Sequence, residues 1–440
     1  MADPLDEIIA ELRAAVERLT AEIAALKVEN AALKAEVARL KGGGKGSKSD
    51  WFKANVPKTE PKPRTPREGG FARRKSEPDE VVVHSLDQCP GCGYALSGGW
   101  LYDDREVIDL PEVKVHVTHH RLMRYRCCGC GKQCTASVDL SATVAGRHRV
   151  SIRLMSFIGY LKTVCRLPRR AIQALLKSVY ALNLSIGGIT EILHDVAARG
   201  ETAYGQLQDA VRSSSFVHAD ETGWRENGDN GYLWSFSTPD VRFFVLSSSR
   251  GSRVAQAALG EYGGILVSDF YPGYNYHTGL KQRCWVHLLR DLHKLTVAWP
   301  QRRTLQRWAK RVNRLYRRAK EFTSPNPELR AQARLRFEAQ AVEMARPAVG
   351  TRQLHAVLAK RLVVFAKELF TFVEHPEVPS DNNAAERSIR PAVVQRKISG
   401  GTRSPKGSHT MGVNMSLYGT WAVRGTDPLK ACAQLLAGSN

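Results

Sequence analysis

The sequence has no apolar run of about 18 residues, which is the length that a membrane-spanning helix requires. It also has no basic-then-apolar leader, because its first residues are acidic and follow a helical pattern. We therefore expect neither a membrane anchor nor secretion, and we expect a cytoplasmic protein. In that compartment thiols stay reduced, so paired cysteines indicate a metal site before a disulfide.

Acidic residues are in short supply. Only 43 Asp and Glu stand against 65 Lys and Arg, which gives a formal net charge of +22. An excess of this size attracts a polyanion, above all nucleic acid. A surface that only keeps the protein in solution is the alternative. With 440 residues and 43% hydrophobic side chains, the chain is long enough for two or three globular domains.

A heptad repeat covers residues 5–41, with leucine at every seventh position from Leu5 to Leu40. β-branched residues fill the other core position except at Asn30, and this combination favours a parallel two-stranded coiled coil with a fixed register. Glu and Lys residues on the flanks complement each other across such an interface. We predict a homodimer through residues 1–41. An amphipathic helix packed on its own domain is the alternative.

A linker and a cysteine-rich domain follow. Residues 42–80 are rich in Lys, Arg, Pro and Ser and predict a basic flexible linker. Residues 81–140 contain two C-x-x-C pairs, which together can place four thiolates around one structural zinc ion. Free buried thiols or a redox site are the alternatives. The predicted zinc ligands are Cys89, Cys92, Cys127 and Cys130, and the competing ligands are Cys128, Cys134, His116, His119 and His120.

Between the two cysteine pairs, Val113, Val115 and Val117 alternate with polar residues. Alternation of this kind predicts a strand, so we expect a small zinc-knuckle β domain.

Residues 141–212 have helical patterns. Pro168 begins one predicted helix, which runs through Tyr180, and a second begins at Ile186 after a tight turn. Two short helices joined in this way and preceded by basic residues permit a DNA-binding helix-turn-helix. A plain segment of a helical bundle is equally compatible. The candidate DNA contacts in this region are Arg169 and Arg170.

Carboxylates follow two apolar segments within residues 213–299. Residues 216–219 form a short apolar run that ends at Asp220, and residues 264–268 form a buried strand that ends at Asp269. A hairpin and a helix are predicted between them. This order of elements suits a mixed sheet that carries an active site at one edge.

Residues 300–375 interrupt this pattern with a helical and strongly basic insertion. Like charges spaced four residues apart destabilise an isolated helix. A phosphate backbone beside the helix removes that repulsion and favours binding through counterion release. A merely solvated basic face is the alternative. The basic residues are Arg302, Arg303, Arg307, Lys310, Arg311, Arg314, Arg317 and Arg318.

A third acid lies in residues 376–440, where Glu386 is one turn into a helix predicted to begin near Asp381. Phosphodiester transfer requires an activated nucleophile, a stabilised leaving oxygen and neutralised phosphoryl charge, and two Mg²⁺ ions about 3.5–4 Å apart supply all three. Mg²⁺ prefers oxygen ligands, and Mn²⁺ can replace it. The predicted catalytic and magnesium-binding residues are Asp220, Asp269 and Glu386.

Four short stretches carry distinctive patterns. They are His-Ala-Asp-Glu-Thr at 218–222, Gly-Tyr-Leu-Trp at 231–234, Ser-Asp-Phe-Tyr-Pro-Gly-Tyr at 268–274 and Asp-Asn-Asn-Ala-Ala-Glu-Arg-Ser-Ile-Arg-Pro at 381–391. These stretches resemble the insertion sequence sixty-six family of bacterial transposases. The order of coiled coil, cysteine knuckles, helical region and split catalytic domain also resembles the family, so the likeness spans nearly the whole chain. His287, within Cys-Trp-Val-His, is similar too.

The resemblance implies a ribonuclease-H-like catalytic domain with a helical insertion, an Asp-Asp-Glu triad and insertion-end DNA as substrate. It also implies a bacterial, nucleoid-associated protein, with accessory proteins often encoded beside it. Residues 221–224 and 398–401 depart from the forms of many members, which concerns subgroup and end specificity. Two other functions stay open: a catalytically silent dimeric DNA-binding regulator, and a nuclease that only hydrolyses. Further predicted DNA contacts are Arg387, Arg390, Arg396 and Lys397.

Overall fold

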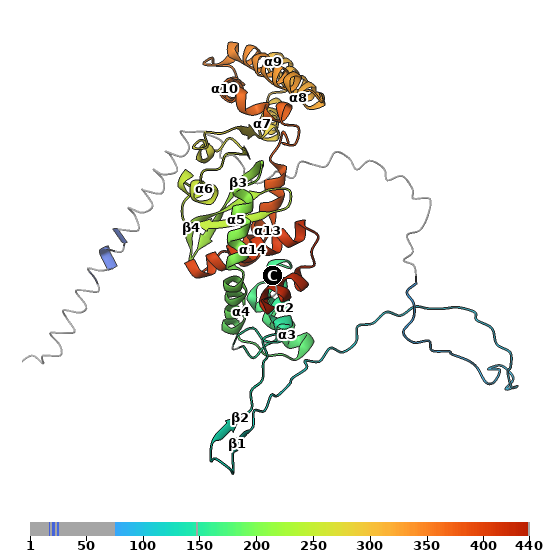
Figure 1. Cartoon of the computed structure of the whole chain (residues 1–440). Coiled ribbons are helices and arrows are strands. Elements are labelled where there is room, and N and C mark those ends of the chain that lie inside the picture. Colours follow the sequence, from blue (N-terminus) through green and yellow to red (C-terminus); the bar gives the residue numbers. More distant parts are fainter. Residues whose placement is uncertain (1–16, 18–19, 23, 26–74, 147, 439–440) are drawn as a thin grey trace, which may run out of the picture. The chain divides into compact units, whose positions relative to one another are not determined.

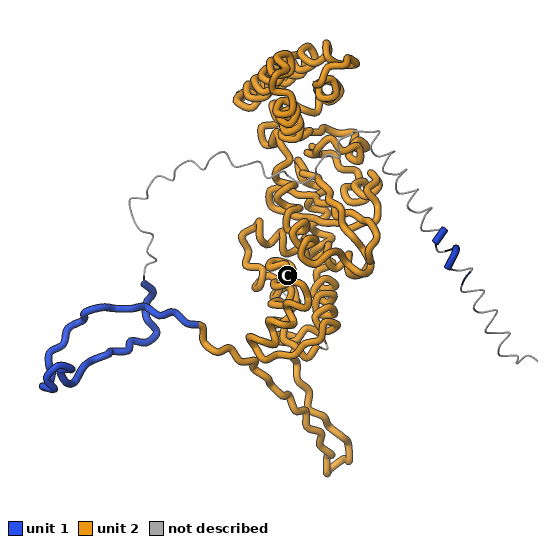
Figure 2. The backbone as a smooth tube through the Cα atoms, turned by 180° about the vertical axis from the view of Figure 1, so that it is seen from behind, with its two compact units in different colours: residues 1–109 blue, residues 110–440 orange. Residues whose placement is uncertain are grey.

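The computed structural model describes residues 17, 20–22, 24–25, 75–146 and 148–438 (Figure 1). The chain divides into two units, residues 1–109 and 110–440, which are coloured separately in Figure 2. The predicted coiled coil and linker lie almost wholly outside the described residues, so the homodimer stays a prediction. Within the described residues, no helix is both long enough and apolar enough to cross a bilayer.

The first unit contributes one cysteine knuckle to the described chain. The amide of Gly93 donates to the carbonyl of Cys89 at 2.8 Å, and Gln88 forms an antiparallel bridge with Ala95. These contacts turn the chain sharply around the first C-x-x-C pair. Apart from Cys89, which is half-buried, residues 75–109 are exposed to solvent.

The second unit begins with a hairpin around the other C-x-x-C pair. Strands β1 (Arg124–Arg126) and β2 (Gln133–Thr135) are antiparallel. The strand predicted at Val113, Val115 and Val117 is wrong, because these residues are exposed and adopt no strand. An alternating segment becomes a strand only where a neighbour takes up its backbone hydrogen bonds. Within the described chain, no segment pairs with these valines.

Helices α2 to α5 lead into the sheet, and both helices predicted in this region are confirmed. Pro168 immediately precedes α3, and Ser185 caps α4 by accepting a hydrogen bond from the amide of Gly188 at 3.0 Å. Buried residues of α2–α4 share one core with Tyr418 and Cys432 from the C-terminal helices. The helix-turn-helix function of α3 and α4 stays a prediction. The helices are α2 (Ile152–Thr163), α3 (Arg169–Tyr180), α4 (Ile186–Arg199) and α5 (Glu201–Arg212).

A mixed five-stranded sheet follows, with strand order β5-β4-β3-β6-β7 (Figure 1). Strands β4 and β5 continue antiparallel from β3, whereas β6 and β7 run parallel to β3. β3 continues past Asp220, where the sequence predicted its end, because β4 pairs with it as far as Glu226. The strands are β3 (Phe216–Glu226), β4 (Asp229–Ser237), β5 (Arg242–Ser247), β6 (Ile265–Ser268) and β7 (Lys281–Arg283).

Helices cover both faces of this sheet. On one face Trp234, Phe236 and Phe243 pack with α5 and with α6 (Ser252–Leu259). On the other, Leu233 and Phe244 pack with helices α13 and α14. Side chains alternate between the faces along each strand, so neighbouring residues contact different helices. The C-terminal helices are α13 (Asn383–Ser399), α14 (Pro405–Val423) and α15 (Pro428–Ala437).

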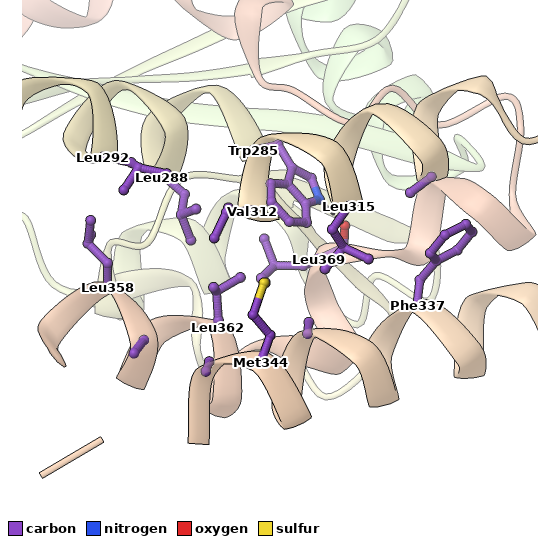
Figure 3. Packing of buried hydrophobic residues seen from close by; sticks show 14 of the residues in the cluster. Trp285, Leu288, Leu292, Val312, Leu315, Phe337, Met344, Leu358, Leu362 and Leu369 are labelled. Carbon is purple, nitrogen blue, oxygen red and sulfur yellow. Dashed lines mark hydrogen bonds between the residues drawn. The ribbon is translucent and has the colours of Figure 1, made fainter. Parts of the chain in front are cut away.

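The basic insertion has a hydrophobic core of its own, shown in Figure 3. Trp285 and Leu288 of α7 pack there with Val312 and Leu315 of α8 and with Met344 of α9. Helix α7 follows β7 directly, so it joins the sheet to the insertion. The helices are α7 (Trp285–Ala298), α8 (Arg303–Glu321), α9 (Pro327–Ala345), α10 (Ala356–Val364), α11 (Ala366–Leu369) and α12 (Thr371–Glu374).

Candidate active site

Asp220 and Asp269 lie side by side at one edge of the sheet. His218 of β3 pairs with Val267 of β6 in parallel register. Asp220 lies two residues further along β3, and Asp269 directly follows Ser268, the last residue of β6. With the alternation of the strands continued to these positions, both side chains are on the same face. Strand pairing therefore brings together two acids that are 49 positions apart in the sequence (269 minus 220).

The backbone around Asp269 is held by hydrogen bonds. Its Oδ1 accepts the amide of Tyr271 at 2.8 Å, which starts the 3₁₀ turn η1 (Pro272–Tyr274). Its carbonyl accepts Nη1 of Arg283 at 2.7 Å. Arg283 is fully buried and pairs with Glu368 of the insertion at 2.6 Å. The insertion thus supplies the counter-ion of the arginine that supports this part of the site.

Asn382 fastens the start of α13 to β3. It is 1% exposed, and its Nδ2 donates to the carbonyl of Ala219 at 2.8 Å. Its Oδ1 lies 2.8 Å from Nδ1 of buried His218, which must donate because an amide oxygen only accepts. The face of β3 that carries Asp220 therefore holds the N-terminal end of α13. Glu386 lies in the first turn of that helix.

Two basic residues of α7 contact Glu386. Its Oε1 is 3.6 Å from Nε2 of His287 and 3.4 Å from Nη2 of Arg290. Nδ1 of His287 is buried and has no hydrogen-bond partner among the described residues. His287 and Arg290 therefore support the third carboxylate.

The environment of Asp220 makes its ionisation costly. Burial, together with the nearby charges of Glu221, Asp269 and Glu386, raises the pKa of its carboxyl to about 8, while the amide of Glu221 opposes the shift. Across the described residues, no three His, Cys, Asp or Glu side chains are gathered closely enough to hold a metal ion. The three predicted acids, Asp220, Asp269 and Glu386, are therefore not gathered into a closed ligand set. Their oxygen donors are of the kind that a hard divalent cation prefers, and their charges lie near enough to raise the pKa of Asp220.

Glu221 is the next residue on β3, but it points to the opposite face. Its side chain is 3% exposed. One oxygen accepts hydrogen bonds from Arg250, and the other accepts the hydroxyl of Tyr274 at 2.6 Å. Because both oxygens already have donors, Glu221 is a poorer metal ligand than Asp220.

A stripe of cationic side chains runs along α8. At about 100° per residue, these side chains fall within an arc of about 120°, opposite the buried face formed by Trp308, Val312 and Leu315. All of them are exposed, and none has an ion-pair partner among the described residues. The stripe consists of Arg303, Arg307, Lys310, Arg311, Arg314, Arg317 and Arg318. Arg302, just before the helix, lies 5.9 Å from the ring centroid of Trp299.

The other predicted DNA contacts occupy different environments. Arg169 is half-buried, and its burial lowers its pKa. Arg170 is exposed and lines a hollow of about 520 Å³ between α3 and the turn at residues 183–185. On α13, Arg396 donates to Thr222 and to the carbonyl of Gly223, so it is engaged with β3. The other three predicted contacts on α13 are exposed: Arg387, Arg390 and Lys397.

Each C-x-x-C pair lies in a tight turn that is closed by backbone hydrogen bonds, from Gly93 to Cys89 and from Gly131 to Cys127. Backbone hydrogen bonds from Gly91 and Cys92 lower the pKa of the Cys89 thiol. The corresponding bonds from Cys130 and Gly129 lower the pKa of the Cys127 thiol. Amide groups that stabilise a thiolate favour metal binding, because the thiolate is the form that binds.

Two family models match this chain. The first, described as Transposase IS66 family, matches residues 147–410, which contain the three carboxylates. The chain belongs to this family. The second, described as the zinc-finger binding domain of transposase IS66, matches residues 87–131, which contain both C-x-x-C pairs. The resemblance stated from the sequence is therefore confirmed, and so is the presence of an IS66 zinc-finger region.

Two curated proteins of Sinorhizobium fredii (strain NBRC 101917 / NGR234) are similar to this IS66 family member. Uncharacterized protein y4jO is 34% identical over 174 residues, which cover 39% of this chain and 51% of that protein. Uncharacterized protein y4jD is 23% identical over 269 residues, covering 53% of this chain and 52% of that protein. The matched part thus spans about half the length of each relative.

Several supporting residues could not be identified from the sequence. Arg290 had a weak signal, since it lies one helical turn after His287 and shares its face. Arg250 lies in a polar loop, and Arg283 looks like any basic residue at a strand end. Nothing in their local patterns indicates a role at this site.

Proposed function

We propose that this IS66 family protein is a metal-dependent DNA transposase that binds the ends of an insertion sequence, cuts DNA strands and transfers them. One observation carries the proposal. The half-buried carboxyl of Asp220 lies on the same face of the sheet as Asp269, and its pKa is raised to about 8 by burial and by neighbouring charges that include Glu386. The mixed sheet that positions these acids supports the ribonuclease-H-like fold implied by the resemblance.

In this proposal Asp220, Asp269 and Glu386 hold two Mg²⁺ or Mn²⁺ ions. When bound, such ions activate the attacking oxygen, neutralise phosphoryl charge and stabilise the leaving oxygen. The chain itself fixes the ligands. Strand pairing sets the two aspartates, Asn382 holds the start of α13, and the basic groups of α7 orient Glu386.

The cationic stripe of α8 is the proposed contact for the DNA backbone. Its charges are exposed and uncompensated by acids, as phosphate binding requires. Cys89, Cys92, Cys127 and Cys130 are the proposed ligands of one structural zinc ion. The remaining proposed DNA contacts are Arg169, Arg170, Arg302, Arg387, Arg390, Arg396 and Lys397.

The proposed assembly is a homodimer through residues 1–41, and accessory proteins of the same element are further candidate partners. The heptad leucines motivate the dimer. Light scattering of the full chain and of a chain without residues 5–41 tests it. A mass that corresponds to a monomer for both chains would contradict the dimer.

Isosteric variants test the catalytic proposal. Asp220→Asn, Asp269→Asn and Glu386→Gln each remove one negative charge with little change of shape. Because ligands of one metal site act as a unit, each change should lower cleavage and strand transfer by more than about 100-fold, and the triple variant should add little. The substrate is duplex DNA carrying the ends of the element, assayed with Mg²⁺, with Mn²⁺ and with Ca²⁺. Asp229→Asn, an exposed acid of the same sheet, is the matched control.

The outcomes separate the alternatives. Cleavage and joining that depend on Mg²⁺ support the transposase. Cleavage without joining indicates a hydrolytic nuclease, and specific binding without cleavage indicates a regulator. A Glu386→Gln protein that transfers strands at the wild-type rate would contradict the triad, and Asp381 would be the next acid to test.

A further inference from the structure

Arg250 occupies the loop between β5 and α6, and three contacts hold its guanidinium in place. Nε and Nη2 donate to one oxygen of Glu221 at 3.2 and 2.8 Å. The guanidinium carbon lies 4.1 Å from the ring centroid of Tyr271 and 5.8 Å from that of Tyr232. An ion pair and an aromatic stack together fix the plane of the group.

The groups that hold Arg250 are themselves fixed. The Glu221 side chain is 3% exposed and also accepts the hydroxyl of Tyr274 at 2.6 Å. The hydroxyl of Tyr271 donates to the carbonyl of Arg250 at 2.6 Å, so ring and loop restrain each other. Arg250 has therefore already lost much of the side-chain freedom that a ligand would otherwise have to remove on binding.

The outer edge of the guanidinium is available to a ligand. The Arg250 side chain is 48% exposed, although its partner is buried. Among the described residues, Nη1 has no hydrogen-bond acceptor. A fixed guanidinium with a free edge is suited to the oxygens of a phosphate group.

Arg250 is connected to both catalytic strands. Its ion-pair partner follows Asp220 directly on β3. Its stacking partner, Tyr271, donates its amide to the carboxylate of Asp269 at 2.8 Å. The guanidinium is therefore linked, through Glu221 and Tyr271, to residues that adjoin Asp220 and Asp269.

We propose that Arg250 binds a DNA phosphate close to the one that is cleaved and so positions the strand for the three carboxylates. This inference rests on the proposed function. A purely structural ion pair between β3 and the loop is the competing explanation. It accounts for the hydrogen bonds to Glu221, but it gives no role to the exposed edge.

Steady-state cleavage of duplex DNA carrying the element ends tests the inference with the full-length protein in Mg²⁺. Arg250→Ala should raise KM for DNA about tenfold and change kcat less than about threefold, because a phosphate contact near the cut mainly binds. The KM of Arg250→Lys should lie between those of the wild type and of Arg250→Ala, since lysine keeps the charge but lacks the planar guanidinium. Arg253→Ala removes an exposed arginine three residues away and should match the wild type.

Arg250→Ala leaves the buried Glu221 without its partner, so the double variant E221Q/R250A is measured beside it. A second readout uses DNA in which single phosphates around the cut are replaced by neutral methylphosphonates. Replacement of one particular phosphate should raise the KM of the wild type about tenfold. The same replacement should leave the KM of Arg250→Ala and of E221Q/R250A unchanged. A structural role would not produce that position-specific loss of coupling.

The failures are distinguishable. If the wild type does not cleave this DNA, the proposed function falls, and the inference falls with it. If the wild type cleaves while E221Q/R250A keeps the wild-type KM, or stays sensitive to every methylphosphonate, then only the role of Arg250 is refuted.

Discussion

At the scale of single residues, Asp220 shows how its position in the fold shifts the pKa of a carboxyl group. Burial and neighbouring acids raise its pKa from 3.8 to about 8. Between pH 3.8 and about 8, this carboxyl is protonated in the folded protein and ionised in the unfolded chain. The free energy of unfolding therefore falls as the pH rises through this range. A cation at the site reverses the penalty, because it favours the ionised form.

The first prediction concerns Asp220→Asn in Mg²⁺-free buffer. Asparagine cannot ionise, so the variant lacks the penalty. Its free energy of unfolding relative to the wild type should increase from about pH 4 to about pH 8, by up to about 1.4 kcal/mol per pH unit, and then level off. Urea unfolding at several pH values measures this difference. Below about pH 4 both proteins should be equally stable.

Asp229→Asn is the control, since this exposed acid should give no such pH dependence. Saturating Mg²⁺ should stabilise the wild type more than Asp220→Asn. A constant difference across the pH range would show that Asp220 is already ionised in the folded protein.

The three acids of the candidate site were predicted from the sequence, but the residues that contact them were not. Each acid follows an apolar run or lies in a distinctive motif, and these are local signals. Support by Asn382 depends on His218, which is 164 residues away, and Arg283 meets Glu368 across 85 residues. Contacts over such separations are set by strand pairing and helix docking, which local patterns do not encode.

At the scale of elements, α8 combines two faces in one helix. Its apolar face fills the core of the insertion, and its cationic stripe faces solvent. Packing against α7 and α9 therefore stabilises a helix that its like charges would destabilise alone. This leaves the stripe free to bind a polyanion.

The second prediction concerns this stripe. Arg314→Gln should lower the slope of log affinity against log salt by about 0.9, and the triple change of Arg307, Arg311 and Arg314 by about 2.7, similarly for every DNA sequence. Lys320→Gln, on the same helix outside the stripe, should leave the slope unchanged. Equilibrium binding from low to moderate salt measures it. Equal slopes for all four proteins would mean that the stripe does not contact phosphates.

Helices and strands formed where the sequence predicted them if the packing of the fold agreed with the local pattern. Helix α3 begins directly after Pro168, and α4 begins after Ser185, whose hydroxyl accepts the amide of Gly188. The alternating segment 113–117 has no pairing partner in the described part of the chain and forms no strand. β3 became longer than expected because its partner β4 is long. Strand existence and length depend on a neighbour, and single-segment patterns do not identify that neighbour.

At the scale of the whole molecule, burial is distributed unevenly along the chain. Among the described residues, residues 75–139 contain no buried side chain, and the hydrophobic core begins at Ala145. A segment without a core has little to offset the entropy of ordering it. The cysteine region therefore requires another source of order, and structural zinc sites supply folding free energy directly.

The third prediction follows from that contrast. Cys92→Ser and Cys127→Ser should each lower the zinc content of the purified protein from about one ion per chain to near zero. Cys165→Ser, an exposed cysteine outside both knuckles, should retain the zinc. Limited proteolysis should then cut within residues 75–140 of the two knuckle variants. The Tm of the remaining core should change by less than about 2 °C, since the buried clusters draw on no residue before Ala145. Elemental analysis measures the zinc content, protease mapping the cut sites and calorimetry the Tm. A zinc content that Cys92→Ser leaves unchanged would contradict the predicted ligands. A large fall in the Tm of the core would contradict the independence of the core from the cysteine region.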